Sequence, residues 1–236
     1  MIEVNGLTKA YGAFTAVENI DLIAKPKEIT ILLGPNGAGK STTIKSIVNL
    51  LKFKGTIRIC GYDNRTIQAK RCFGYIPEAP ILYDLLTIDE HVEFIGRAYR
   101  CADYKALADK YIALFHLEDK RNSIAKELSK GMRQKLSMLL ALIISPRALL
   151  VDEPMVGLDP ASIEETLRLF QDLKADGVSI LISTHIIDVV EEIWDVAYIM
   201  DKGQIINRVK REDTQEETLK ETFFASTEGD SDESAD

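Results

Sequence analysis

The chain has 236 residues, a length that fits one large domain or a core with an inserted subdomain. Hydrophobic residues make up 46% of it, enough for a core, but the longest apolar run, near residues 136–144, is about half of what a membrane span needs. The net charge is −8, and residues 212–236 alone hold ten acidic residues and one lysine. The rest of the chain is therefore close to neutral and has no basic stripe, which argues against a nucleic-acid partner.

The start of the sequence and its cysteines both point to the cytosol. No charged-then-apolar signal peptide opens the chain. The three cysteines, Cys60, Cys72 and Cys101, have no C-x-x-C spacing, so we expect reduced thiols without a metal or disulfide role.

Residues 1–28 show the apolar alternation of short strands, with turn signals at residues 5–6 and 25–26. Tyr11 follows the first of these strands. Its ring could stack on an adenine, whereas the alternative is an ordinary loop tyrosine. The expected strands cover residues 2–4, 16–17 and 20–23.

The stretch at residues 29–43, ITILLGPNGAGKSTT, predicts a buried strand, a glycine-rich loop and a helix. Its glycines let successive backbone N–H groups curl around an anion, and the helix N-terminus adds positive potential. Lys40 can neutralise the outer phosphates, and the Ser41 hydroxyl is a hard oxygen ligand for Mg²⁺. A glycine-rich turn that binds nothing would not explain why all these features coincide. We therefore predict a nucleoside triphosphate site.

Two further strands are expected at residues 55–60 and 74–76. Pro77 stops the second, so Glu78 emerges at a strand end, where ligand groups gather in α/β sheets. The pattern then becomes helical over residues 81–144, which is long enough for an inserted subdomain.

Three helices are expected in this block. The first opens with a capping box at Thr87, and this helix continues to Tyr99. Asp103 is expected to cap the second, and the third begins near Ser129.

After the helical block, residues 148–154 form a continuous apolar run that ends in Asp152 and Glu153. Residues 178–185 form a second run that ends in His185. Together with a crossover helix at 160–176, they predict a parallel sheet whose active edge lies at the strand C-termini. Asp152 can hold Mg²⁺ opposite Ser41, and Glu153 could polarise an attacking water; the alternative is a helix-capping acidic pair.

The end of the chain predicts three simple features. Residues 197–208 read as a hairpin, and Thr218 opens a capping box for a helix that ends near Phe224. Residues 226–236 are small and acidic, which is typical of a solvated, disordered tail.

These motifs, in this order, resemble the ATP-binding subunit of ABC transporters over residues 1–225. Residues 150–153 look like the end of the Walker B motif, 157–159 like the D-loop, and 183–185 like the switch-histidine motif. Residues 128–132 occupy the position of the signature motif, and Tyr11 matches the aromatic that stacks on adenine. The Walker A loop is resembled by Gly34, Pro35, Asn36, Gly37, Ala38, Gly39, Lys40, Ser41 and Thr42.

The resemblance implies a fold and a division of the chain. The expected fold is α/β: a RecA-like P-loop NTPase core with an N-terminal antiparallel β subdomain and an inserted α-helical subdomain. The core and the β subdomain would use residues 1–78 and 146–225, and the insertion about 79–145. Residues 226–236 would remain an acidic tail.

The resemblance also implies roles for the site residues. Glu153 and His185 would be catalytic, ATP would be bound with Mg²⁺, and the metal would be held by Ser41, Glu78 and Asp152. Two such subunits would pack head to tail, each ATP lying between the Walker A loop of one and the signature of the other. The contacts from the second subunit would come from Ser129, Lys130, Gly131, Met132 and Asp159.

Two positions depart from the family pattern. Glu78 stands where the family usually has a glutamine; the carboxylate keeps an oxygen ligand but adds a negative charge. The signature reads LSKGM where LSGGQ is commonest, and it places Lys130, Arg133 and Lys135 near a helix N-terminus that disfavours cations. A phosphate arriving there would offset the repulsion; the alternative is a solvated basic face.

The resemblance implies that a separate transmembrane permease uses this ATPase. The subunit would then be cytoplasmic and peripheral, attached to the membrane through the permease. The sequences GYIPE (residues 74–78) and LSKGM (residues 128–132) look more like those of ATPases that serve ABC-2-type or Ecs-like exporters than like those of importer ATPases. Two alternatives remain: a soluble ABC ATPase that acts in assembly or repair, and a regulatory subunit without turnover.

Overall fold

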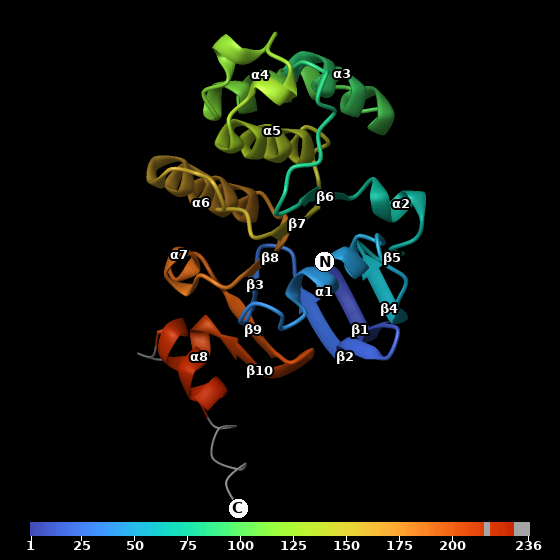
Figure 1. Ribbon diagram of the computed structural model, residues 1–236, viewed down its shortest axis with the longest axis vertical. Coiled ribbons are helices and arrows are strands. Elements are labelled where there is room, and N and C mark those ends of the chain that lie inside the picture. The colour runs from blue at the N-terminus through green and yellow to red at the C-terminus, as the bar shows by residue number, and fades with distance from the viewer. Residues whose placement is uncertain (215–217, 229–236) are drawn as a thin grey trace, which may run out of the picture.

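The computed structural model describes residues 1–214 and 218–228, and it arranges them as two β-sheets and a set of helices (Figure 1). The antiparallel sheet contains β1 (Ile2–Tyr11), β2 (Phe14–Ala24), β4 (Lys54–Ile59) and β5 (Tyr62–Asp63), in the order β2-β1-β4-β5. None of the helices within the described residues has the length and apolar character that crossing a bilayer demands.

The second sheet has six strands in the order β10-β9-β3-β8-β7-β6. Strand β3 lies between β8 and β9 and runs parallel to both, while β9 and β10 form an antiparallel hairpin. The predicted parallel sheet and the predicted hairpin are thereby confirmed. The strands are β3 (Ile29–Leu33), β6 (Phe73–Ile76), β7 (Ala148–Asp152), β8 (Ser179–Thr184), β9 (Val196–Asp201) and β10 (Gln204–Lys210).

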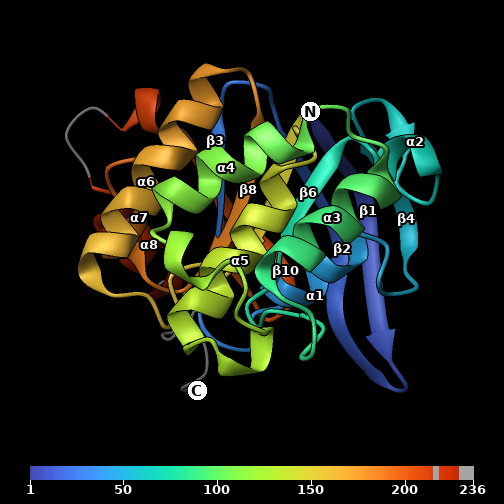
Figure 2. The same ribbon diagram turned by 90° about the horizontal axis from the view of Figure 1, so that it is seen from above.

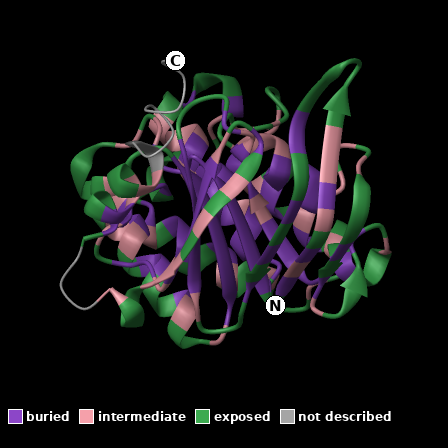
Figure 3. Cartoon of the chain, turned by 90° about the horizontal axis from the view of Figure 1, so that it is seen from below, coloured by how far each residue is buried: buried purple, intermediate pink, exposed green. Residues whose placement is uncertain are grey.

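The two faces of the six-stranded sheet belong to different cores. Because side chains alternate across a strand, Ile29, Ile31 and Leu33 face one core, which the larger helices cover. Leu32 faces the other core, where helix α1 (Lys40–Ile47) packs between the two sheets. Both faces of the central strands are therefore buried (Figure 3).

Helix α1 is fixed at its far end by a buried amide. Asn64 Nδ2 donates to the carbonyl oxygens of Ser46 (3.0 Å) and Ile47 (2.9 Å), the last residues of the helix. The amide thus satisfies the Ile47 carbonyl and adds to the bond that the Ser46 carbonyl accepts from the Asn49 N–H (3.0 Å).

The predicted helical block contains α3 (Ile88–Tyr99), α4 (Tyr104–Leu114) and α5 (Lys130–Leu142), with short 3₁₀ turns at Glu118–Lys120 and Ala125–Glu127. These helices lie together at one end of the molecule (Figure 1) and cover the six-stranded sheet when seen from above (Figure 2). The Thr87 capping box is confirmed, with Thr87 N–H donating to Glu90 Oε2 (2.8 Å) and Glu90 N–H donating to Thr87 Oγ1 (3.2 Å).

The remaining helices are α2 (Ile67–Lys70), α6 (Pro160–Ala175), α7 (Ile187–Val190) and α8 (Leu219–Glu228), with a 3₁₀ turn at Arg211–Asp213. Helix α6 is the predicted crossover between β7 and β8. Helix α8 has the expected Thr218 capping box, because Thr218 N–H donates to Glu221 Oε2 (2.8 Å) and Glu221 N–H to Thr218 Oγ1 (3.2 Å).

Three local expectations were wrong. Residues 5–6 make no turn; Gly6, with φ of 60°, lies at a register shift within the ten-residue strand β1, so the glycine serves a bulge. Asp103 precedes α4 but makes no capping hydrogen bond, because its backbone (φ −101°, ψ 16°) lacks the extended conformation of a cap. The last helix runs to Glu228, four residues beyond Phe224, so residues 226–228 of the predicted tail are helical; residues 229–236 lie outside the described residues.

Candidate functional site

The loop between β3 and α1 can turn tightly because three of its residues are glycines. Gly37 and Gly39 adopt φ of 85° and 106°, where other residues are strained. A Cβ on Gly39 would lie 2.7 Å from the Ala16 carbonyl oxygen, and one on Gly34 would collide with the Met200 carbonyl. Strands β2 and β9 therefore press against the loop and hold its shape.

Lys40 is buried and points back into this loop. Its Nζ donates to the carbonyl oxygens of Gly34 (2.8 Å) and Pro35 (3.1 Å) and lies 3.7 Å from Glu153 Oε1. Burial lowers the pKa of the Lys40 ammonium, while the carboxylates of Glu153 and Asp152 act in the opposite direction. The cation is thus kept at the loop by acceptors that an anionic phosphate can replace.

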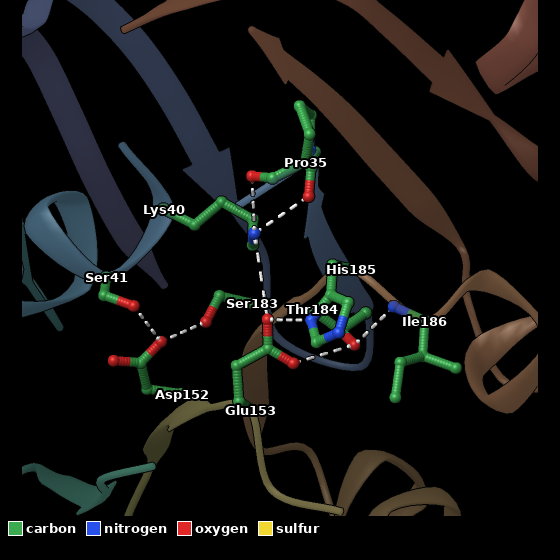
Figure 4. A network of polar contacts seen from close by, with 10 residues as sticks. Pro35, Lys40, Ser41, Asp152, Glu153, Ser183, Thr184, His185 and Ile186 are labelled. Atoms are coloured by element: carbon green, nitrogen blue, oxygen red, sulfur yellow. Dashed lines mark hydrogen bonds and ion pairs between the residues drawn. The ribbon is translucent and has the colours of Figure 1, made fainter. Parts of the chain in front are cut away.

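Asp152 ends strand β7 with its side chain fully buried. Its Oδ1 accepts hydrogen bonds from Ser41 Oγ (2.9 Å) and Ser183 Oγ (2.5 Å), which come from α1 and β8 (Figure 4). Its other oxygen, Oδ2, is buried without a hydrogen-bond partner among the described residues. A buried carboxylate oxygen that lacks a donor is suited to a cation.

These residues fit Mg²⁺ bound together with a triphosphate. Asp152 and Ser41 supply hard oxygen atoms, and Glu78 lines a cavity that Ser41 also lines. The described residues contain no cluster of three or more His, Cys, Asp or Glu side chains able to hold a metal. Mg²⁺ usually takes one or two protein ligands and completes its shell with phosphate and water.

Glu153 follows directly and has an unusual backbone, with φ of 47°. Its N–H donates to the Ser183 carbonyl (3.0 Å). The side chain, 9% exposed, is held by His185 Nδ1 at 2.8 Å from Oε1 and by Thr184 Oγ1 at 3.2 Å from Oε2 (Figure 4). Strained backbone that persists through surrounding contacts is typical of functional sites.

A single cavity of about 440 Å³ joins most of the predicted nucleotide site. Tyr11 stands at its edge, 48% exposed, with the Lys9 ammonium 4.6 Å from its ring centre. An exposed aromatic beside a phosphate loop offers a face on which a base can stack. The predicted residues that line the cavity are Tyr11, Asn36, Gly37, Gly39, Lys40, Ser41, Thr42, Glu78, Glu153 and His185.

Comparison with known proteins identifies the site. Residues 17–156 match the family model described as ABC transporter. The chain belongs to the ABC transporter family. The ABC-type transporter ATP-binding protein EcsA of Bacillus subtilis (strain 168) is 34% identical over 212 residues, an alignment that spans 87% of this chain and 85% of EcsA.

Solved structures agree with this assignment. A structure described as the ATP binding subunit of an ABC transporter has 34% identity and a TM-score of 0.91, covering 96% of this chain and 99% of the other. The ATP-binding cassette MJ0796, solved as a dimer in a post-hydrolysis state with ADP and Pi, has 26% identity and a TM-score of 0.81, covering 89% of this chain and 98% of the other. The predicted P-loop NTPase fold is confirmed, and the chain is an ABC ATPase.

The residues predicted to form the signature of this ABC ATPase lie outside the cavity. Ser129 is the N-cap of α5, and its Oγ accepts the Met132 N–H (3.3 Å). Lys130 is exposed, and its stem passes close to Gly157, where a Cβ would lie 3.0 Å from its Cδ. Gly131 faces Gly157, and a Cβ added to Gly131 would lie 3.0 Å from the Gly157 carbonyl oxygen. The signature thus packs on the loop that follows Glu153.

Asp159 is also separate from the cavity and caps α6. Its Oδ1 accepts the Ser162 N–H (3.0 Å) and its Oδ2 the Ser162 hydroxyl (2.6 Å), and these bonds lower the pKa of the Asp159 carboxyl. The five residues predicted to contact the nucleotide of a second subunit are therefore held apart from the nucleotide site of their own chain.

Some site contacts have a faint sequence signal. Ser183 and Thr184, two hydroxyl residues that close the apolar strand β8, bond to the two carboxylates that close β7; this pairing of polar strand ends could have been noticed. Phe14 lines the cavity and pairs with Tyr11 across the hairpin, which only the register reveals.

A pair of glycine substitutions tests the loop geometry. We expect Gly39→Ala to abolish ATP binding, since it combines a strained φ with a clash against the Ala16 carbonyl. Gly37→Ala meets no protein atom within 4 Å, so it should leave the fold intact and add a strain of about 1–2 kcal/mol. ATP affinity and melting temperature of both variants give the comparison. Equal losses in the two would contradict the role assigned to the β2 contact.

Proposed function

We propose that this ABC ATPase hydrolyses ATP with Mg²⁺ at the cavity, pairs head to tail with a second ATP-binding subunit, and energises a separate transmembrane permease. The supporting observation is the separation of the two half-sites. The phosphate loop and Glu153 share one cavity. The exposed N-terminus of α5 offers a second anion site, which lies outside that cavity. Dimerisation joins the two halves, and hydrolysis removes the phosphate between them.

The cavity supports a simple division of labour. Lys40 exchanges its carbonyl acceptors for the outer phosphates, and the loop N–H groups bind the remaining charge. Glu153 accepts a proton from the attacking water, with His185 beside it to contact the γ-phosphate. Ser41, Asp152 and Glu78 would hold Mg²⁺, which when bound neutralises charge on the phosphates. The Glu78 carboxylate adds a negative charge to the proposed Mg²⁺ site.

The permease is expected to dock beside Glu78. An apolar hollow of about 300 Å³ lies between β6, α3 and α5, and Leu82, Ile95, Tyr99 and Leu140 are among its lining residues. Ile81 stands at its edge with 81% of its surface exposed. Exposed apolar surface of this kind marks interaction sites.

The neighbouring segment is held in place by His91. The imidazole Nδ1 donates to the Thr87 carbonyl (2.8 Å), and Nε2 accepts the Tyr83 N–H (3.0 Å). Burial lowers the pKa of His91, which keeps the accepting nitrogen free of a proton. The segment at residues 81–83, beside the proposed docking hollow, is thereby attached to α3.

Export is the direction we propose, and it rests on the resemblance of the LSKGM signature to those of exporter ATPases. The subunit would be peripheral on the cytoplasmic face of the membrane. We retain the division into a core with β subdomain (1–78 and 146–225) and a helical insertion (79–145). The alternative function is that of a soluble ABC ATPase in assembly or repair.

Glu153→Gln tests the catalytic base. We expect ATP to bind and the dimer to persist, while turnover falls by about 10²–10⁴-fold because the amide cannot accept the proton. Steady-state hydrolysis and size-exclusion chromatography with ATP measure both. Glu118→Gln, at an exposed site far from the cavity, serves as control. Turnover near that of the wild type would remove Glu153 from the base role.

A charge at Leu82 tests the docking hollow. Leu82→Glu should uncouple transport while sparing basal ATPase activity. Because Leu82 also contacts the core, Ile81→Glu at the exposed neighbour provides a second variant. Ile67→Glu, equally apolar and 67% exposed on α2, is the matched control. Normal transport in both docking variants would place the permease elsewhere.

Affinity capture of the full chain from detergent-solubilised native membranes tests the partner. A stoichiometric partner with many membrane spans is expected, and its type would establish export or import. Capture of soluble proteins alone would favour the alternative function and leave the site chemistry intact.

A further inference from the structure

The Glu153 carboxylate has three partners, and they divide unevenly between its oxygens. Lys40 Nζ (3.7 Å) and His185 Nδ1 (2.8 Å) both approach Oε1. The Thr184 hydroxyl (3.2 Å) is the contact that the structure gives for Oε2. Figure 4 shows the three groups converging on Glu153 from the loop and from the end of β8.

The contacts to Oε1 are made by groups that also face the nucleotide cavity. Lys40 and His185 line it, and both are placed to meet phosphate oxygens. Thr184 is 4% exposed and is not part of the cavity lining. When a triphosphate draws Lys40 and His185 toward itself, the Thr184 bond can remain on the carboxylate.

The Thr184 hydroxyl has a fixed direction. A hydroxyl carries one donor and two acceptor positions, and Thr184 Oγ1 accepts the Ile186 N–H (3.1 Å). Its proton is therefore available to Glu153 Oε2. The preceding residue completes the support, because the Ser183 carbonyl accepts the Glu153 N–H.

This support matters because of the backbone at Glu153. With φ of 47°, the residue occupies a conformation that it would not prefer alone, and the direction of its side chain depends on outside contacts. We propose that Thr184 is a positioning residue for hydrolysis: its hydroxyl holds Glu153 Oε2 so that Oε1 can face the attacking water once ATP is bound. The inference rests on the proposed base role of Glu153.

Thr184→Val and Thr184→Ser in the full chain form the test. Valine keeps the shape and removes the hydroxyl, so kcat should fall by about 10- to 100-fold, the effect of one hydrogen bond to a charged group. The KM for ATP should stay within about twofold, since the contact is not made to the substrate. Serine restores the donor and should recover most of the lost kcat.

A double-mutant cycle separates positioning from general damage. If Thr184 acts through Glu153, Thr184→Val combined with Glu153→Gln should lose no more turnover than Glu153→Gln alone. Melting temperatures and ATP-dependent dimerisation of Thr184→Val show that the fold and the binding site persist.

Three results would overturn the inference: normal kcat in Thr184→Val, equal damage by valine and serine, or additive losses in the double variant. Its failure can be distinguished from failure of the proposed function. If Glu153→Gln loses turnover but Thr184→Val does not, only the positioning role is wrong. If Glu153→Gln keeps turnover, the base role fails, and the Thr184 inference fails with it.

Discussion

Two adjacent carboxylates at the end of a fully buried strand are the constraint on which this structure depends. Asp152 and Glu153 are 0% and 7% exposed, and charged groups at such depth are stable only with donors or cations nearby. Two elements meet this need: the start of α1 supplies the Ser41 hydroxyl and the Lys40 ammonium, and the polar end of β8 supplies two further hydroxyls. Elements distant in sequence must therefore be assembled before the charges can be buried.

The two cores give this assembly its rigidity. The alternation of side chains in β3 sends Ile31 toward the helical block and Leu32 toward α1 and the antiparallel sheet. The phosphate loop begins where this doubly buried strand ends, and two of its glycines, Gly34 and Gly39, lie against the backbone of β9 and β2. A loop so enclosed can present its N–H groups without rearranging when an anion arrives, which favours binding.

The sequence alone was enough to predict the loop, the paired carboxylates, the parallel sheet and the helical block, because each depends on local spacing or on apolar periodicity. It did not predict contacts that depend on three-dimensional register. The bulge at Gly6 looks like a turn in sequence, and Asp103 has the right residue type for a cap but the wrong backbone. The role of Thr184 requires knowing that β7 and β8 are neighbours whose polar ends meet.

The position of β3 has a consequence for synthesis on the ribosome. Its neighbours in the sheet, β8 and β9, start about 150 and about 170 residues later in the chain. The Gly203 N–H, later still, donates to the Ala38 carbonyl in the phosphate loop (3.0 Å). The loop is translated soon after β2, yet β8, β9 and the turn at Gly203 are translated long after it. A nascent chain thus carries an apolar β3 without its sheet partners until β8 and β9 have been made, a period in which chaperone binding or nonspecific association competes with folding.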